Sequence, residues 1–123
     1  MCVRWGIACL MALMLCACAD KSDPARTITG ADADNGLAVM SRVGCSACHM
    51  IPGIAWPQGL SGPSLAGFAK NPMISGRFPN QPDVLVRWLI DAPSMAPPTG
   101  MPAMPLTQSE AQDVAAYLYT LDD

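Results

Sequence analysis

Apolar side chains recur at helical spacing in three stretches of the chain. The first stretch predicts a helix that Asp32 caps and that Gly44 ends. Its apolar face holds Gly36, Leu37, Met40 and Val43. No stretch shows the sustained alternation of apolar and polar residues that is typical of a half-buried strand. The pattern therefore predicts an all-α domain.

The other two predicted helices have clear end signals. Asn80 is the expected N-cap of a helix from Gln81 to about Ala92, which Pro93 terminates. The last helix is expected to begin at Thr107-Gln108-Ser109-Glu110, which has the pattern of a capping box. In a capping box the side chains of the first and fourth residues each accept a hydrogen bond from the other's backbone amide. Its apolar positions are Val114, Tyr117, Leu118 and Leu121.

Two segments rich in proline and glycine separate these helices, from His49 to Phe78 and from Pro93 to Pro105. A stretch as long as the first, without regular structure, is unusual in a compact domain unless something else organises it. The sequence therefore predicts a bound group that these loops enclose.

The first residues have the form of a targeting segment. Arg4 precedes the apolar run Ile7 to Leu15, which is too short to cross a membrane and suits a signal peptide. Leu15-Cys16-Ala17-Cys18 resembles a lipobox, in which Cys18 would be lipidated and become the first mature residue. We favour this interpretation, and ordinary cleavage after a small-residue motif is the alternative. The expected organisation is a signal peptide over 1–17, a flexible polar tether over 18–31 and one domain over 32–123.

Composition and charge narrow the possible functions. Hydrophobic residues make up 51% of the chain and charged residues 14%, which suits a small globular domain. The formal net charge is −3, and lysine and arginine do not cluster, so we expect no nucleic-acid partner.

The motif Cys45-Ser46-Ala47-Cys48-His49 has the C-x-x-C-H spacing of a haem attachment site. Each thiol can add to one haem vinyl group, and His49 is then placed to ligate the iron. A zinc site would need further ligands, whereas His49 is the only histidine and Cys2, Cys9 and Cys16 lie in the removed segment. A redox dithiol would need a βαβ context, and a structural disulfide is the remaining alternative. The motif predicts one haem c, covalently attached through Cys45 and Cys48.

A second axial ligand must come from elsewhere in the chain, and methionine is the soft, neutral side chain that suits haem iron. The candidates distant from the motif are Met73, Met95, Met101 and Met104. Met101 stands out because its loop is stiffened by proline and held between two predicted helices, and Met104 remains the alternative.

From about Asp32 to Leu121 the sequence resembles the class I c-type cytochromes. The features that carry the resemblance occur in the same order: the helix with Gly36 and Met40, the C-x-x-C-H motif, Gly62-Pro63-Ser64-Leu65, Pro97-Pro98-Thr99-Gly100-Met101-Pro102 and the Val114 to Leu118 helix. The resemblance implies a fold in which the terminal helices cross and long loops surround the haem. It also implies a Gly36–Tyr117 contact at that crossing.

The resemblance assigns roles to two further residues. Met101 matches the Met of a Pro-x-Thr-x-Met pattern and would be the sixth ligand, whereas Met104 does not match it. The carbonyl of Pro63 would accept a hydrogen bond from the proximal His49.

We therefore expect a single-electron carrier that is not an enzyme, located on the periplasmic side of a bacterial membrane. Its expected partners are a membrane-bound oxidase or dehydrogenase, met transiently, and the membrane itself through a lipid on Cys18. The alternative function is a haem protein with an open sixth position that senses a gas or acts as a catalyst.

Overall fold

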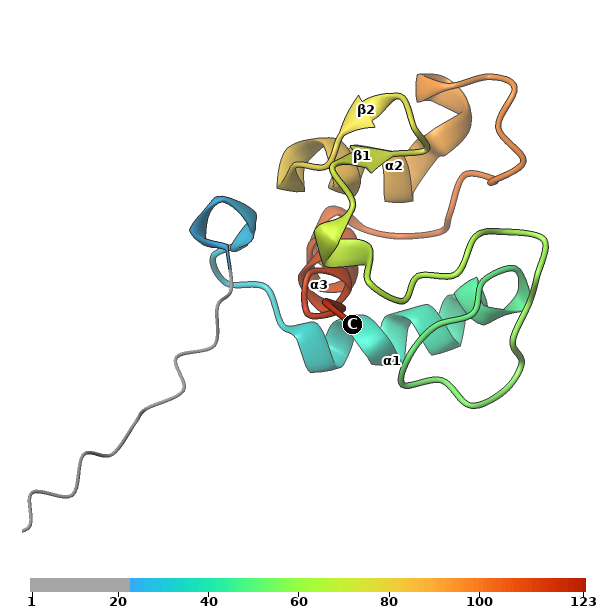
Figure 1. The fold of residues 1–123 in the computed structure, drawn as a ribbon, viewed down its shortest axis with the longest axis horizontal. Helices are drawn as coiled ribbons and strands as arrows, with labels where there is room; N and C mark the ends of the chain where they lie inside the picture. The colour runs from blue at the N-terminus through green and yellow to red at the C-terminus, as the bar shows by residue number, and fades with distance from the viewer. Residues whose placement is uncertain (1–22) are drawn as a thin grey trace, which may run out of the picture.

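A computed structural model describes residues 23–123, which form a bundle of helices joined by long loops (Figure 1). The α-helices of this part are α1 (Ala33–Val43), α2 (Pro82–Met95) and α3 (Gln108–Leu118). The minor elements are the 3-10 turns η1 (Pro24–Arg26), η2 (Cys45–Ala47) and η3 (Phe68–Lys70) and the strands β1 (Met73–Ile74) and β2 (Phe78–Pro79). The prediction of an all-α class is confirmed. The predicted signal peptide and Cys18 lie outside the described residues.

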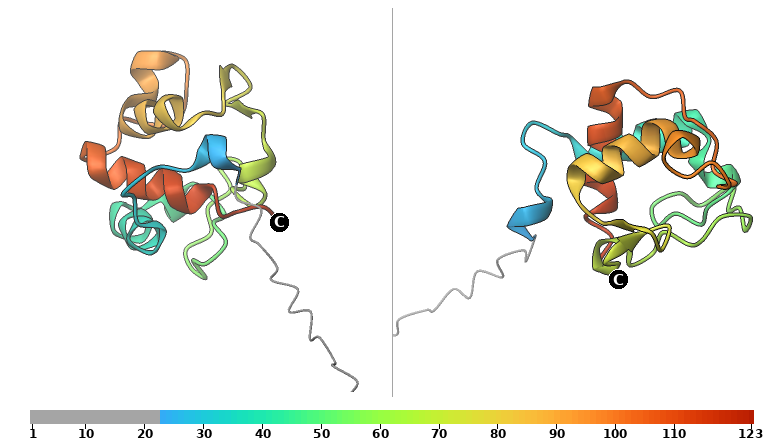
Figure 2. Two further views of the ribbon diagram at one scale, coloured as in Figure 1. Left: turned by 90° about the vertical axis from the view of Figure 1, so that its left-hand side faces the viewer. Right: turned by 90° about the horizontal axis from the view of Figure 1, so that it is seen from above.

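Helix α3 packs against both other helices and crosses α1 at Gly36 (Figures 1 and 2). A Cβ atom at Gly36 would lie 2.1 Å from the backbone oxygen of Asp113, so only glycine permits this approach. The resemblance implied Tyr117 as the partner of Gly36, but the closest approach is one turn earlier, at Asp113 and Val114. The hydroxyl of Tyr117 instead donates to the carbonyl of Pro52 at 2.6 Å.

Local signals set the ends of α1 and α3 as predicted. The Asp32 carboxylate accepts from the amides of Asp34 and Asn35, and Gly44 ends α1 in the left-handed region at φ 82°. Thr107 and Glu110 form both hydrogen bonds of the capping box.

Asn80 does not cap α2, and that prediction is wrong. Gln81 is the N-cap residue, whereas Asn80 is 4% exposed and its amide donates to the carbonyls of Phe68 and Asn71. The hydroxyl of Tyr119 donates to Oδ1 of Asn80. Burial raises the pKa of this phenol to about 12, so it keeps its proton. The buried side chain of Asn80 therefore links several segments by hydrogen bonds and does not cap the helix.

The C-terminal end of α2 also differs from the prediction. The backbone of Asp91 leaves the helical region, with φ −149°. One further helical turn follows, which contains Pro93 and ends at Met95. The carboxylate of Asp91 accepts from the backbone amide of Ser94 at 3.2 Å and so caps this short turn. Pro93 is thus part of a new turn and does not terminate the helix.

The segment predicted to be irregular contains a short antiparallel hairpin of β1 and β2, with Ile74 opposite Phe78. Ile74 is buried, and Phe78 packs against the buried Trp88 of α2 with ring centroids 5.9 Å apart and the ring planes tilted by 47°. The hairpin therefore fastens the middle of the chain to α2.

Residues 23–31, the described part of the predicted tether, include η1, at the left in Figure 1, and contact the domain through Arg26 and Ile28. The Arg26 guanidinium donates to the carbonyls of Ala69 and Asn71 and lies 5.7 Å from the centroid of the Tyr119 ring. These contacts hold Arg26 against the domain, and the flexible tether over 18–31 stays a prediction.

Candidate haem attachment site

The two cysteines of the C-x-x-C-H motif lie on a helical turn that follows α1 directly. Gly44 reverses the chain, and the amides of Cys48 and His49 both donate to the carbonyl of Cys45, at 3.2 Å and 3.0 Å. The two cysteines form no disulfide with each other, and Cys45 is half-buried whereas Cys48 is exposed. Burial raises the pKa of the Cys45 thiol, and the nearby Cys48 adds to this effect against a backbone hydrogen bond that lowers it.

The ring of His49 is held by Pro63 and Gly62. Its Nδ1 lies 2.7 Å from the carbonyl oxygen of Pro63, the contact that the resemblance implied. A carbonyl can only accept, so Nδ1 carries the proton and Nε2 is left free to ligate a metal. On one side of the ring, a Cβ at Gly62 would lie 2.5 Å from Cε1 of His49. The backbone therefore packs directly on the imidazole.

A second segment of backbone runs along the attachment turn and fixes Pro63. The amides of Gly59, Gly62 and Leu65 donate to the carbonyls of Ser46, Cys48 and Met50, each at 2.8–2.9 Å. A Cβ at Gly59 would lie 2.2 Å from the carbonyl oxygen of Ala47. The sequence did not predict that Gly59 packs on the attachment turn. Its distance along the chain from the C-x-x-C-H motif was the only available signal.

Met101 lies in the loop between α2 and α3, partly buried and packed against the core. The hydroxyl of Thr99 accepts from the backbone amide of Met101 at 3.2 Å, and the amide of Thr99 donates to Ala96 at 2.9 Å. The threonine of the Pro-x-Thr-x-Met pattern thus fixes the backbone before Met101. The turn after α1 and this loop both lie at the right-hand side in Figure 1 and in the right-hand view of Figure 2.

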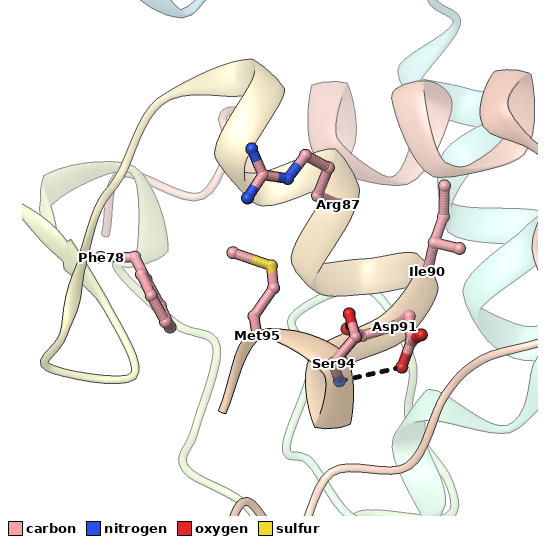
Figure 3. A pocket seen from close by; sticks show the side chains of 6 residues that line it. All are labelled: Phe78, Arg87, Ile90, Asp91, Ser94 and Met95. Atoms are coloured by element: carbon pink, nitrogen blue, oxygen red, sulfur yellow. Dashed lines mark hydrogen bonds between the residues drawn. The ribbon is translucent and has the colours of Figure 1, made fainter. Parts of the chain in front are cut away.

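The other methionine candidates occupy different surroundings. The amide of Met104 donates to the carbonyl of Ile90 at 3.0 Å, which ties this residue to α2. Met73 is on the hairpin and 41% exposed. Met95 points toward Phe78 and Arg87 in a pocket of about 350 Å³ whose lining comes from β2 and α2 (Figure 3).

The side chains around the attachment turn fit a covalently held haem. Two thiols share one turn, Gly62 lets the backbone pack closely on the imidazole, and Nε2 of His49 is the ring nitrogen that Pro63 does not engage. Among residues 23–123, no three His, Cys, Asp or Glu side chains gather into a group that could hold an ion by themselves. Within the same residues, the helices lack the length and hydropathy needed to cross a bilayer.

Two comparisons with known proteins find a match. The family model described as "Cytochrome c" matches residues 33–122. The structure is similar to a chain in the crystal structure of SoxXA from P. pantotrophus, with a TM-score of 0.57 and 20% identity, covering 76% of this chain and 83% of that one. At this identity the similarity supports the fold alone. No curated protein matches the chain.

Proposed function

Because the chain belongs to the cytochrome c family, with a covalently bound haem c that transfers electrons, we propose that it is a single-electron carrier with His49 and Met101 as axial ligands. Cys45 and Cys48 have the attachment spacing of that family. The observation that best supports the proposal is the 2.7 Å contact between His49 Nδ1 and Pro63 O, which selects the tautomer that a proximal histidine needs.

When bound, the haem supplies an iron that accepts and releases one electron at a time. The residues of the chain would orient the haem and keep substrates from its iron. Pro63 fixes the His49 ring by accepting the Nδ1 proton, and Thr99 fixes the backbone that presents Met101. If His49 and Met101 both hold the iron, the chain would leave no position on it for a substrate, which favours a carrier over an enzyme.

We further propose that the protein works on the periplasmic side of a bacterial membrane, anchored by a lipid on Cys18, beside a respiratory oxidase or dehydrogenase. Only residues 19–22 separate Cys18 from the docked segment that begins at Asp23. That stretch spans at most ~3.6 Å per residue, so the domain would stay close to the bilayer. A short reach raises the effective concentration of a membrane-bound partner.

The experiment compares wild-type and Cys18→Ser proteins in a host that processes lipoproteins. Haem loading should be equal, whereas the variant should leave the membrane fraction and deliver electrons to membranes more slowly at equal haem content. A wild-type mature chain that begins at Asp20 and washes off freely would contradict the anchor. A purified wild-type protein that cannot be reduced and reoxidised would contradict the carrier.

A further inference from the structure

Two large apolar side chains next to the attachment turn are almost fully exposed. Trp56 is 85% exposed and Leu60 is 82% exposed, and both lie in the loop that follows His49. Burial of such side chains is favourable, and a tryptophan is among the residues that contribute most to protein interfaces. Neither residue has a role in the proposed attachment and ligation of the haem.

This loop is held in place against the turn that carries the cysteines. Leu60 and Ser61 lie between two glycines whose backbone is fixed. The amide of Gly59 donates to the carbonyl of Ser46, and the amide of Gly62 donates to the carbonyl of Cys48, both at 2.8 Å. Leu60 therefore projects from a short, fixed span beside Cys48. A fixed exposed side chain loses less conformational entropy on binding than one on a mobile loop.

The two segments that contain the attachment turn and the Met101 loop also carry no charged side chain. No Asp, Glu, Lys or Arg occurs from Val43 to Ala69, nor from Ala92 to Ser109. The turn and the loop both lie at the right-hand side in Figure 1 and in the right-hand view of Figure 2. A charged partner surface buried here would lose its hydration without gaining an opposite charge.

We propose that Trp56 and Leu60 form an apolar docking surface for a redox protein whose own surface, around its electron-exchange site, is uncharged and apolar. This inference rests on the proposed function and specifies the partner's chemistry. Complex formation at this surface would bring the partner next to Cys48 and thus to the attachment turn. Because no charges steer the encounter, association should depend little on salt.

Two other occupants of the same surface are outcomes of the test. A bilayer is less suited to it, because the docked N-terminal segment with Arg26 lies on the side away from the attachment turn (Figure 1). An anchor at that end would leave Trp56 and Leu60 facing away from the lipid. A second copy of this chain would give a dimer that depends on Trp56.

The experiment measures the second-order rate of electron transfer from reduced holoprotein to washed membranes and to the periplasmic fraction of the source organism. All proteins carry Cys18→Ser, so that a lipid cannot contribute. Trp56→Ser and Leu60→Ser should each lower the rate about tenfold, because each removes a large apolar side chain from the interface. Met73→Ser is the matched control, since Met73 is also an exposed apolar residue but lies on the hairpin, and it should keep the wild-type rate. The wild-type rate should change less than about twofold between low and physiological salt.

Reduction potential and absorption spectrum should be unchanged in all three variants, which separates docking from damage to the haem site. Wild-type rates in both the Trp56 and Leu60 variants, or a steep fall of the wild-type rate with salt, would overturn the docking surface and leave the carrier function intact. The docking surface for a redox protein would also be overturned if sedimentation showed a dimer of the wild type that Trp56→Ser abolishes. Binding of the wild type, but not of Trp56→Ser, to phosphatidylcholine vesicles would overturn it as well. If the wild-type protein gives electrons to neither fraction, the proposed function fails, and the docking surface fails with it.

Discussion

Nδ1 of His49 lies 2.7 Å from the carbonyl oxygen of Pro63, a residue 14 positions further along the chain. This contact joins the end of the attachment turn to the loop that runs back alongside it. It decides which ring nitrogen carries the proton, and it does so through backbone, so the side chain of residue 63 matters mainly for shaping the loop.

Gly62→Ala should disturb the proximal histidine. The added methyl would lie 2.5 Å from Cε1 of His49, and the backbone of residue 62 is held by Cys48, so the ring must move. We expect a lower yield of holoprotein and an altered absorption spectrum in what remains. Ser61→Ala, at an exposed position in the same loop, should leave both unchanged. Normal haem loading and spectrum in Gly62→Ala would show that the ring does not depend on this contact.

Gly36→Ala should weaken the crossing of α1 and α3. Its methyl would lie 2.1 Å from a backbone oxygen of Asp113, which cannot rotate away. Overpacking typically costs about 1–3 kcal/mol, and the gain of about 1 kcal/mol in helix propensity only partly offsets it. Denaturant unfolding of the holoprotein should show a net loss of up to about 2 kcal/mol at unchanged haem content. The exposed Ser41→Ala on the same helix should stay within about 0.5 kcal/mol of wild type.

Glu110 should make the stability of the domain depend on acid pH. Its pKa is lowered, first by the backbone amide of Thr107 and then by the Thr107 hydroxyl, with Arg42 contributing less. A carboxyl with a lowered folded-state pKa adds stability that is present above its usual value of about 4.3 and is lost as the pH falls through the lowered value. Glu110→Gln keeps the hydrogen-bonding shape of the capping box but not the charge. The variant should be less stable than wild type at neutral pH and should converge with it as the pH falls through the lowered pKa of Glu110. A constant difference from pH 7 to pH 3 would contradict the assignment.

Arg26→Gln should release the N-terminal segment without affecting the haem site. The substitution removes the hydrogen bonds to Ala69 and Asn71 and the cation above the Tyr119 ring. Limited proteolysis should cleave residues 23–31 faster, while the spectrum and potential stay as in wild type. Arg77→Gln, an exposed arginine of the hairpin loop, serves as the control and should be cleaved at the wild-type rate. Equal cleavage of all three proteins would show that Arg26 does not hold the segment.

The features that the sequence predicted well depend on neighbours in the chain. The caps of α1 and α3 need only residues within one turn, and the spacing of Cys45, Cys48 and His49 lies within a single turn as well. These elements could be predicted because the local pattern and the tertiary structure agree.

The features that it missed depend on residues far apart in the chain. Asn80 has the composition of a cap, but carbonyls 9 and 12 residues away compete for its amide and win. Asp113 looks like a solvated acid on α3, yet it is 7% exposed and accepts from the Asp32 amide and the Asn35 side chain. Arg26 docks on residues more than 40 positions away, which no local rule could indicate.

The most direct test of the central claim, a low-spin carrier ligated by His49 and Met101, is the far-red absorption of the oxidised holoprotein together with its potential. Wild type and Met104→Ala should show the weak band of methionine ligation. Met101→Ala should lack that band and have a lower reduction potential, with the haem still covalently attached, because attachment depends on Cys45 and Cys48 and the potential depends on the axial sulfur. Loss of the band in Met104→Ala with its retention in Met101→Ala, or a wild-type protein without the band that binds carbon monoxide, would contradict the account.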